Sequence, residues 1–396
     1  MRSHLFGSSA LAAMIFAVGP VQAAQPLELS VGGFGSVIVG YASQDSDHLE
    51  KRTGGSVEVS DVDVKGDNEL HFKAQTVLDN GLVVSMKYEI EAGGRGDNSV
   101  DNYSISLGGA YGTLVAGATD MVTGALASRA PHMGQRLFGD GLADCDLATG
   151  TWVLKPSYGT GNGEHKGGFA SVINSHSDNE SISYISPSFA GFTLGATYVP
   201  EGADGKKHDS EMPHDSNTQD VYAIALAYEN RFGGLTVASD VGWATLDTKP
   251  DSSTTNRFDG QQEVQAGLNL GYAGVTVGGG YRLIKRDYTG SAAQDRQVRS
   301  WEAGVGYRTG PYGVAIAHAQ TRADFTEATV TGLGIGVTVD VERTNTTQLT
   351  AEYAMGPGVL LVGGVGHVQF ETEGQNITAK HENSGWVAAT GLSLSF

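Results

Sequence analysis

The stretch SGWVAATGLSLSF, Ser384–Phe396, alternates between an apolar face and a face of small or polar residues. The apolar parity carries Trp386, Ala388, Thr390, Leu392, Leu394 and Phe396. A period of two predicts a β-strand, and the length suits a tilted strand that crosses a bilayer, which needs about 9–11 residues. An aromatic ring at each end of the apolar face matches the preference of membrane–water interfaces. Because an unpaired terminal strand would be an exposed edge, we expect it to pair with the first strand and close a barrel.

The composition and the N-terminus predict an exported chain with a single barrel domain. The chain has 396 residues with 57 glycines and 10 prolines, and only 17% of its residues are charged. The N-terminus has Arg2, an apolar core at Leu11–Val18 and small residues up to Ala23, which predicts a signal peptide over residues 1–23. A buried N-terminal helix is the alternative. The remaining residues, 24–396, are expected to form one barrel domain without a transmembrane helix.

Charge and cysteine content exclude two other classes. The net charge of −19 includes Arg2, so removal of residues 1–23 leaves −19 − 1 = −20. Such acidity argues against nucleic acid as a partner. The single cysteine, Cys145, rules out an internal disulfide framework, and its role is open.

The most informative hairpin is NELHFKAQTVLDNGLVVSMKYEIEA, residues 68–92, with a turn signal at Asp79–Gly81. Its two runs alternate between an apolar and a strongly polar face. The polar positions are Glu69, His71, Lys73 and Gln75 in the first run, and Ser85, Lys87, Glu89 and Glu91 in the second. If Asn80 centres the turn, paired residue numbers sum to about 160. Lys73 then faces Lys87, and His71 faces Glu89.

Similar hairpins recur along the chain, including Gln262–Gly271 with Val275–Arg286, and Gln348–Met355 with Val359–Phe370. With an N-terminal strand at Leu27–Ala42, seven hairpin pairs and the terminal strand, the pattern predicts sixteen strands. Turns are short at one end and loops long at the other, as in outer-membrane barrels. The faces of one strand, Tyr312–Phe325, are ambiguous because three polar residues share a parity with two apolar ones: His318, Gln320 and Arg322 with Val314 and Ile316.

Four segments carry a resemblance to a known family: HFKAQTVLDNGL, YGTLVAGATD, ISYISPSFAGFTLGATYVP and GLSLSF. Together they resemble the trimeric general diffusion porins of Gram-negative outer membranes. The resemblance implies a sixteen-stranded transmembrane antiparallel β-barrel with periplasmic termini and a third loop folded inward. It also implies a homotrimer, for which Gly33 and Gly35 give a hint of close packing. Phe396 would be part of an assembly signal read by the barrel assembly machinery.

The longest stretch without strand patterning, Asp120–Lys166, takes the position of that third loop. A loop of this length is usually functional or disordered, and its aromatic and apolar residues argue against plain disorder. Folded inward, it would narrow a water-filled lumen, whereas an outward-lying surface loop is the alternative. The candidate constriction residues are Arg129, Arg136, Asp140, Asp144 and Asp146, of which the three aspartates would form an acidic rim.

The opposing pore wall is expected on the polar face of the 68–92 hairpin. Lys73 and Lys87 each lie six residues from the turn (73 to 79 and 81 to 87), which places them about 14 Å up a tilted strand. Charges at that height should face water inside the barrel. The candidate wall residues are His71, Lys73, Lys87, Glu89 and Arg282. They are alternatively solvated lumen residues without selectivity.

The acidic region Ser43–Asp67 is expected to be a loop. Its residues Asp61, Asp63, Gly66 and Asp67 imitate the start of a calcium loop, although Lys65 stands in a ligand position. We expect no cofactor and no dedicated metal site, with divalent cations and anionic lipid or lipopolysaccharide as possible partners of the acidic loops. No spacing of catalytic residues predicts an enzyme.

The sequence therefore predicts a passive channel for small hydrophilic solutes and ions. A substrate-selective channel of the same fold, a plugged structural or adhesive barrel, and a secreted soluble sandwich are the alternatives.

Overall fold

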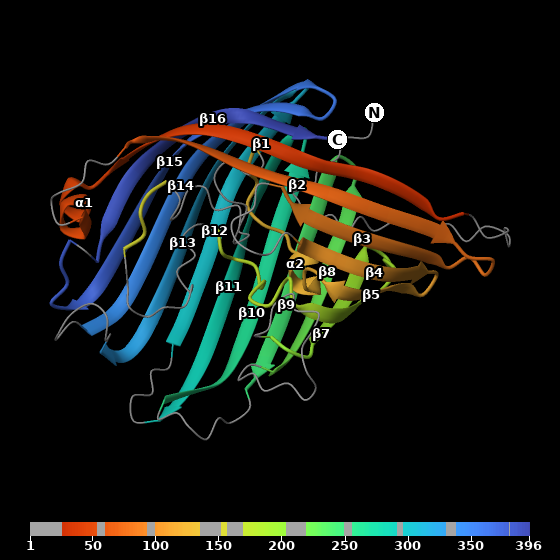
Figure 1. Cartoon of the computed structure of the whole chain (residues 1–396), viewed down its shortest axis with the longest axis horizontal. Helices are drawn as coiled ribbons and strands as arrows, with labels where there is room; N and C mark the ends of the chain where they lie inside the picture. Colours follow the sequence, from red (N-terminus) through yellow and green to blue (C-terminus); the bar gives the residue numbers. More distant parts are fainter. Residues whose placement is uncertain are drawn as a thin grey trace.

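The computed structural model describes residues 26–53, 60–92, 100–134, 152–156, 169–202, 219–248, 256–290, 296–329, 338–379 and 381–396. Within them, sixteen strands form one closed antiparallel barrel (Figure 1). Each strand pairs with its neighbours in the sequence, and β1 pairs with β16. The predicted all-β barrel and its number of strands are confirmed. Among the described residues, no helix is both long and apolar enough to cross a membrane.

The first eight strands are β1 (Glu28–Gln44), β2 (Val62–Val77), β3 (Val83–Glu91), β4 (Val100–Gly109), β5 (Gly112–Ala118), β6 (Glu180–Ile185), β7 (Phe192–Val199) and β8 (Gln219–Phe232). The next eight are β9 (Leu235–Asp247), β10 (Asn256–Tyr272), β11 (Val275–Gly290), β12 (Arg296–Thr309), β13 (Tyr312–Thr329), β14 (Thr338–Gly356), β15 (Val359–Gln375) and β16 (Asn383–Ser395). Two short helices, α1 (Ser46–Thr53) and α2 (Val122–Ala125), lie in the connections.

The terminal strand closes the barrel as its alternation predicts. Val37 pairs with Leu392 and Tyr41 with Ala388, which removes both free sheet edges. The pairing continues to the last residue, because the N–H groups of Gly33 and Phe396 each donate to the other's carbonyl oxygen at 3.1 Å. A Cβ on Gly33 would overlap the backbone carbonyl of Glu69 on β2. The glycine is therefore required by strand contact within one barrel.

Burial divides each strand into two unlike faces. Outward positions are large, apolar and exposed, such as Ile224 at 49% and Leu349 at 50%. Inward positions include buried polar side chains, such as Thr321 at 1% and Gln348 at 2%. A soluble domain has the opposite arrangement, so this exterior suits lipid and this interior suits polar groups.

The two ends of the barrel differ in the length of their connections. At one end the chain reverses in tight turns, as between β2 and β3, where the Gly81 N–H donates to the Leu78 carbonyl oxygen at 2.8 Å. Gly81 has a φ of +80°, a left-handed conformation that glycine adopts without a steric cost. The connections at the other end are longer, and the longest, residues 119–179, joins β5 to β6. The predicted asymmetry of the loops is confirmed.

Several predicted boundaries are wrong. β10 begins at Asn256 rather than Gln262, and β14 at Thr338 rather than Gln348, because polar residues continue these strands past their apolar part. The predicted loop at Ser43–Asp67 is also too long. It contains α1, and β2 begins at Val62 and pairs Asp67 with Ser36 of β1. Asp63, Gly66 and Asp67 thus lie in a strand, which excludes a calcium loop there.

Candidate pore constriction

The predicted register of the first hairpin is confirmed. Lys73 pairs with Lys87, and His71 pairs with Glu89, across β2 and β3 on the inward face. Lys73 is exposed, whereas the Lys87 Nζ lies 2.8 Å from the Glu89 Oε1. The carboxylate therefore compensates part of the repulsion between the two ammonium groups.

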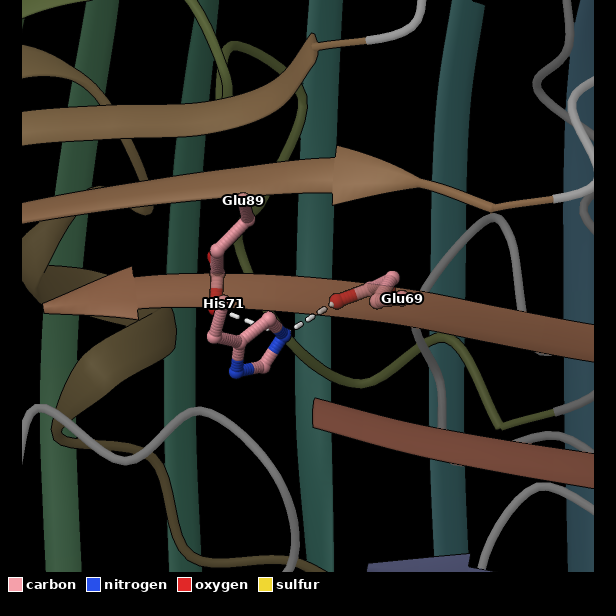
Figure 2. A group of neighbouring side chains, drawn as sticks. All are labelled: Glu69, His71 and Glu89. Atoms are coloured by element: carbon pink, nitrogen blue, oxygen red, sulfur yellow. Dashed lines mark hydrogen bonds and ion pairs between the residues drawn. The ribbon is translucent and has the colours of Figure 1, made fainter. Parts of the chain in front are cut away.

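His71 lies between two glutamates on this wall (Figure 2). Its Nε2 is 2.8 Å from the Glu69 Oε2 and 3.1 Å from the Glu89 Oε1. One donor atom from each of these three residues lies within 4.8 Å of the others, and this mixed nitrogen and oxygen set could hold a divalent transition metal. Lys87 also pairs with the Glu89 Oε1, so ion pairs explain why these side chains lie together without a metal. The register predicted from the turn brings His71 opposite Glu89, but no motif in the sequence marks the three residues as a metal site.

The first described part of the segment between β5 and β6, residues 119–134, runs along the inner face of several strands. Backbone N–H groups of this segment donate to inward side chains on four of them: Val122 to Thr197 Oγ1 on β7 (3.0 Å), Ser128 to Asp240 Oδ1 on β9 (2.6 Å), Ala130 to Glu302 Oε1 on β12 (2.8 Å) and Met133 to Thr350 Oγ1 on β14 (2.9 Å). Gly134 donates in the same way to the Glu352 Oε2 at 3.1 Å. Residues 122–134 are thus fastened to strands on several sides of the barrel.

Later described residues of the segment contact β1 and β10. The buried Trp152 lies against Gly40 of β1, where a Cβ would overlap the indole ring. The Leu154 N–H donates to the Gln44 Oε1 at 2.7 Å, which reaches the seam between β1 and β16. On the return path, the Ile173 N–H donates to the Gln265 Oε1 of β10 at 2.7 Å.

Asp120 is influenced by one positive charge on the wall, that of Lys87, and by one on the segment, that of Arg129. Burial raises the pKa of this carboxyl above its ordinary value, while the charges of Lys87 and Arg129 act in the opposite direction. Arg129, a predicted constriction residue, is half-buried in the same region. An acid of the segment therefore lies within the electrostatic reach of the wall lysine Lys87.

Other predicted site residues have different surroundings. Arg282 faces inward but is buried, and its Nη2 lies 2.5 Å from the Glu263 Oε2. It also donates to the Ser175 Oγ, so it links the segment to the wall, with its charge compensated. The remaining predicted constriction residues, and the cysteine, lie outside the described residues: Arg136, Asp140, Asp144, Asp146 and Cys145.

Sequence reasoning missed the residues that fasten the segment. The acceptors Asp240, Glu302 and Glu352 are carboxylates on the inward parity of β9, β12 and β14. A carboxylate on that parity was the available signal. The sequence pattern marks Asp120 only as the first residue of the predicted loop.

A family model described as Gram-negative porin matches residues 9–373 of the chain. The chain belongs to this family. This porin is accordingly a passive diffusion channel of the outer membrane, which its strands cross many times. A search of curated proteins found no match to its sequence.

Solved structures agree with the fold of this porin. An anion-selective porin from Comamonas acidovorans has 16% identity and a TM-score of 0.57, with 94% of this chain and 100% of that chain covered. The trimer form of OmpT, an outer membrane protein of Vibrio cholerae, has 12% identity and a TM-score of 0.58, with 95% and 100% covered. The outer membrane channel DcaP of Acinetobacter baumannii has 12% identity and a TM-score of 0.56, with 93% and 97% covered.

Proposed function

We propose that this porin passes small hydrophilic solutes and ions through a water-filled lumen that is narrowest where the segment after β5, at Asp120, comes within electrostatic reach of Lys87 on β3. The observation that carries the proposal is the series of hydrogen bonds that fastens residues 122–134 to inward side chains of β7, β9, β12 and β14. A segment held across the lumen reduces the cross-section that a solute can pass.

The narrow region would be polarised. Lys73 and Lys87 stand on the wall, and Asp120 on the segment is within the influence of Lys87. A transverse field of this kind orders water and polar solutes and disfavours apolar ones.

The test reverses the charge of the wall. Replacing Lys73 and Lys87 by glutamate changes the local charge by 2 × (−2) = −4, and we expect the reversal potential across a salt gradient to shift toward stronger cation preference. The measurement uses planar bilayers at low ionic strength, where screening is weak. The matched control, Arg299→Glu with Arg322→Glu, makes the same charge change on the outward face and should leave the potential unchanged. A wild-type potential and conductance in the lysine variant would show that these lysines do not line the constriction.

The same recordings separate the alternatives. A plugged adhesive barrel would give no steps in single-channel current, and a substrate-selective channel would show block by one class of added solute. The proposal further includes a homotrimer, which the trimer form of Vibrio cholerae OmpT supports, and a chain without enzymatic activity or resident cofactor. We propose further that residues 1–23 are removed as a signal peptide and that the barrel assembly machinery delivers the chain to the membrane. The barrel would contact lipopolysaccharide, and its acidic loops would bind divalent cations.

A further inference from the structure

The outward face of β13 changes character along the strand. Near the short-turn end it carries the exposed apolar side chains Val314 and Ile316, and on the same parity it continues with His318, Gln320 and Arg322. This explains the ambiguous parity of Tyr312–Phe325: one face of the strand lies in two environments. Apolar side chains suit lipid, whereas an arginine facing outward at the same depth would be costly.

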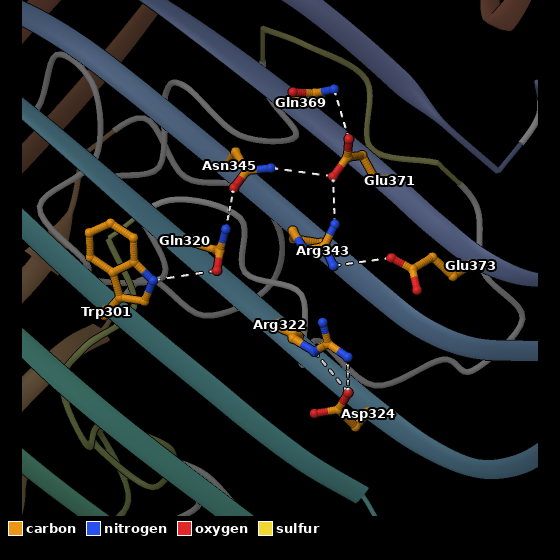
Figure 3. Close-up of polar contacts among 9 residues, drawn as sticks. All are labelled: Trp301, Gln320, Arg322, Asp324, Arg343, Asn345, Gln369, Glu371 and Glu373. Carbon is orange, nitrogen blue, oxygen red and sulfur yellow. Dashed lines mark hydrogen bonds and ion pairs between the residues drawn. The ribbon is translucent and has the colours of Figure 1, made fainter.

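The change is shared by the neighbouring strands, and strand pairing joins the outward residues into rows (Figure 3). One row has an indole and three amides: Trp301, Gln320, Asn345 and Gln369 on β12 to β15. The next row toward the long-loop end is charged: Arg299, Arg322, Arg343 and Glu371. On β8 to β11 the same register row is apolar: Ile224, Trp243, Val264 and Leu283. The row that is charged on β12–β15 is therefore apolar on β8–β11.

The height of the arginine row follows from the strand geometry. Tyr312 and Tyr353 stack beside the short turns with ring centroids 5.1 Å apart, as in an interfacial aromatic girdle. Arg322 lies 322 − 312 = 10 residues further along β13. At about 3.3 Å per residue and a tilt near 40°, this is about 25 Å in height, the thickness of the apolar band of such barrels. The row thus lies at the opposite membrane–water boundary.

The arginines are held in place by acids on the same surface. Arg299 Nη1 and Arg322 Nη2 lie 3.0 Å and 2.8 Å from the two carboxylate oxygens of Asp324. Arg343 forms ion pairs of 3.1 Å with both Glu371 and Glu373. The three arginine side chains remain between 24% and 45% exposed. A guanidinium has five N–H donors, so these pairs fix its plane and leave donors for a further anion.

We propose that this arginine row, Arg299, Arg322 and Arg343, binds the phosphorylated head group of an anionic glycolipid in the outer leaflet. Planar guanidinium groups match phosphate oxygens in pairs, and the amide row below offers donors and acceptors to sugar hydroxyl and acyl-amide groups. The exposed apolar side chains Val305, Ile316, Leu349 and Val365 lie below the rows on the same four strands, where acyl chains would lie. The inference rests on the proposed function, which counts lipopolysaccharide among the contacts of the barrel, and on the periplasmic termini that the family resemblance implies. β1 begins beside the short β2–β3 turn, since Glu28 pairs with Gln75, so the long-loop end then points away from the cell.

The experiment compares the purified, folded porin with the triple variant Arg299→Gln, Arg322→Gln, Arg343→Gln. The probe is bisphosphorylated lipid A, titrated into detergent-solubilised protein and followed by native mass spectrometry. We expect the apparent Kd to rise about tenfold in the variant, because charge-assisted hydrogen bonds to phosphate are lost. The control, Arg231→Gln, removes an exposed arginine next to a short turn and should bind as the wild type does. Arg343→Lys keeps the charge without the paired donors and should bind less tightly than the wild type.

Three results would overturn the inference. The first is equal affinity of wild type and triple variant for the lipid. The second is equal affinity of the wild type for lipid A and for its dephosphorylated form, or displacement of lipid A by an equimolar amount of inorganic phosphate. The third is dissociation of the oligomer by the triple change with lipid binding intact, which would make the surface a contact with a second copy. Single-channel conductance should be unchanged in every variant, so a failed lipid site leaves the proposed channel function standing. If the triple variant does not fold, Arg299→Gln, which alters the most exposed arginine, replaces it in the same titration.

Discussion

Asp120 joins the acidic segment to the basic wall, and its ionisation should govern how selectivity responds to pH. Burial raises the pKa of this carboxyl, so it takes up a proton at a higher pH than an ordinary aspartate does as the solution is acidified. The positive charges of Lys87 and Arg129 then lose a partner. We expect the reversal potential of the wild type to move toward anions on acidification, and the Asp120→Asn variant to show the potential of the acidified wild type without this pH dependence.

Asp120 should also affect how the stability of the fold depends on pH. The pKa of Asp120 is higher in the folded than in the unfolded state. Asp120 therefore stabilises the folded state at pH values below its unfolded pKa, and this stabilisation is lost as the pH rises through its folded pKa. Asp120→Asn should therefore unfold no more readily than the wild type at neutral pH. Asp79→Asn, at the exposed turn between β2 and β3, is the control. An Asp120→Asn variant that keeps the full pH response of the wild type would remove Asp120 from the account of selectivity.

Phe396 should matter more for assembly than for the stability of the finished barrel. Its backbone exchanges two hydrogen bonds with Gly33, which are a small part of the pairing between β1 and β16. We expect deletion of Phe396 to reduce the amount of protein in the outer membrane of cells, whereas refolding into detergent micelles survives. Quantitative surface labelling and gel migration measure the two effects. A normal surface level of the deletion variant would contradict the prediction.

At the scale of elements, residues 128–134 should be the part of the interior segment that limits its motion. Asp240 and Glu302 accept backbone N–H groups of Ser128 and Ala130, and each such bond to a charged group is worth about 1.5–3 kcal/mol. The double variant Asp240→Ala, Glu302→Ala should loosen the segment. We expect greater noise in the open-channel current and closure at a lower applied voltage in planar bilayers.

The control for this variant is Asp324→Ala, which removes a carboxylate from the outward face of β13. It should leave the current noise at the wild-type level in pure phospholipid bilayers. If the double variant is as quiet as the wild type, residues 128–134 are held by other contacts, such as those of Met133 with Thr350.

The hairpins could be predicted from sequence, whereas the path of the interior segment could not. The Asp79–Gly81 turn fixes the register of β2 and β3 locally, so the facing of Lys73 and Lys87 follows from counting residues. The hydrogen-bond partners of Ser128, Ala130 and Met133 are instead separated from them in sequence by 112, 172 and 217 positions. No periodicity along the chain encodes such contacts, because they depend on which strands face each other across the closed barrel.

The whole molecule should behave as a barrel that requires an apolar environment. Its exposed large side chains form the outward surface, and its closed sheet has no free edge within the described residues. We expect the protein to aggregate without detergent. In detergent it should give strand-rich circular dichroism and migrate differently on gels before and after boiling. A monomer that stays soluble without detergent would be incompatible with this surface.

Closure and number of strands were predictable at this scale because each strand repeats the same alternation. The boundaries of the long strands at the long-loop end could not be predicted. In β14, for example, polar residues near that end face outward as well as inward. A binary pattern of apolar and polar residues identifies the part of a strand in lipid. It fails where the strand continues into the head groups, so the missed residues are those that form the arginine row.

The bonds that fasten the interior segment have a consequence for redesign of the pore. At Ser128, Ala130, Met133 and Gly134 the donor is a main-chain N–H, and the acceptor belongs to the wall. The anchorage therefore does not depend on which side chain occupies the exposed parts of the segment, with the exception of proline, which has no N–H. Libraries that vary residues 127, 129 and 132 could recode the filter for a chosen antibiotic or nutrient, while the frame that holds it stays constant.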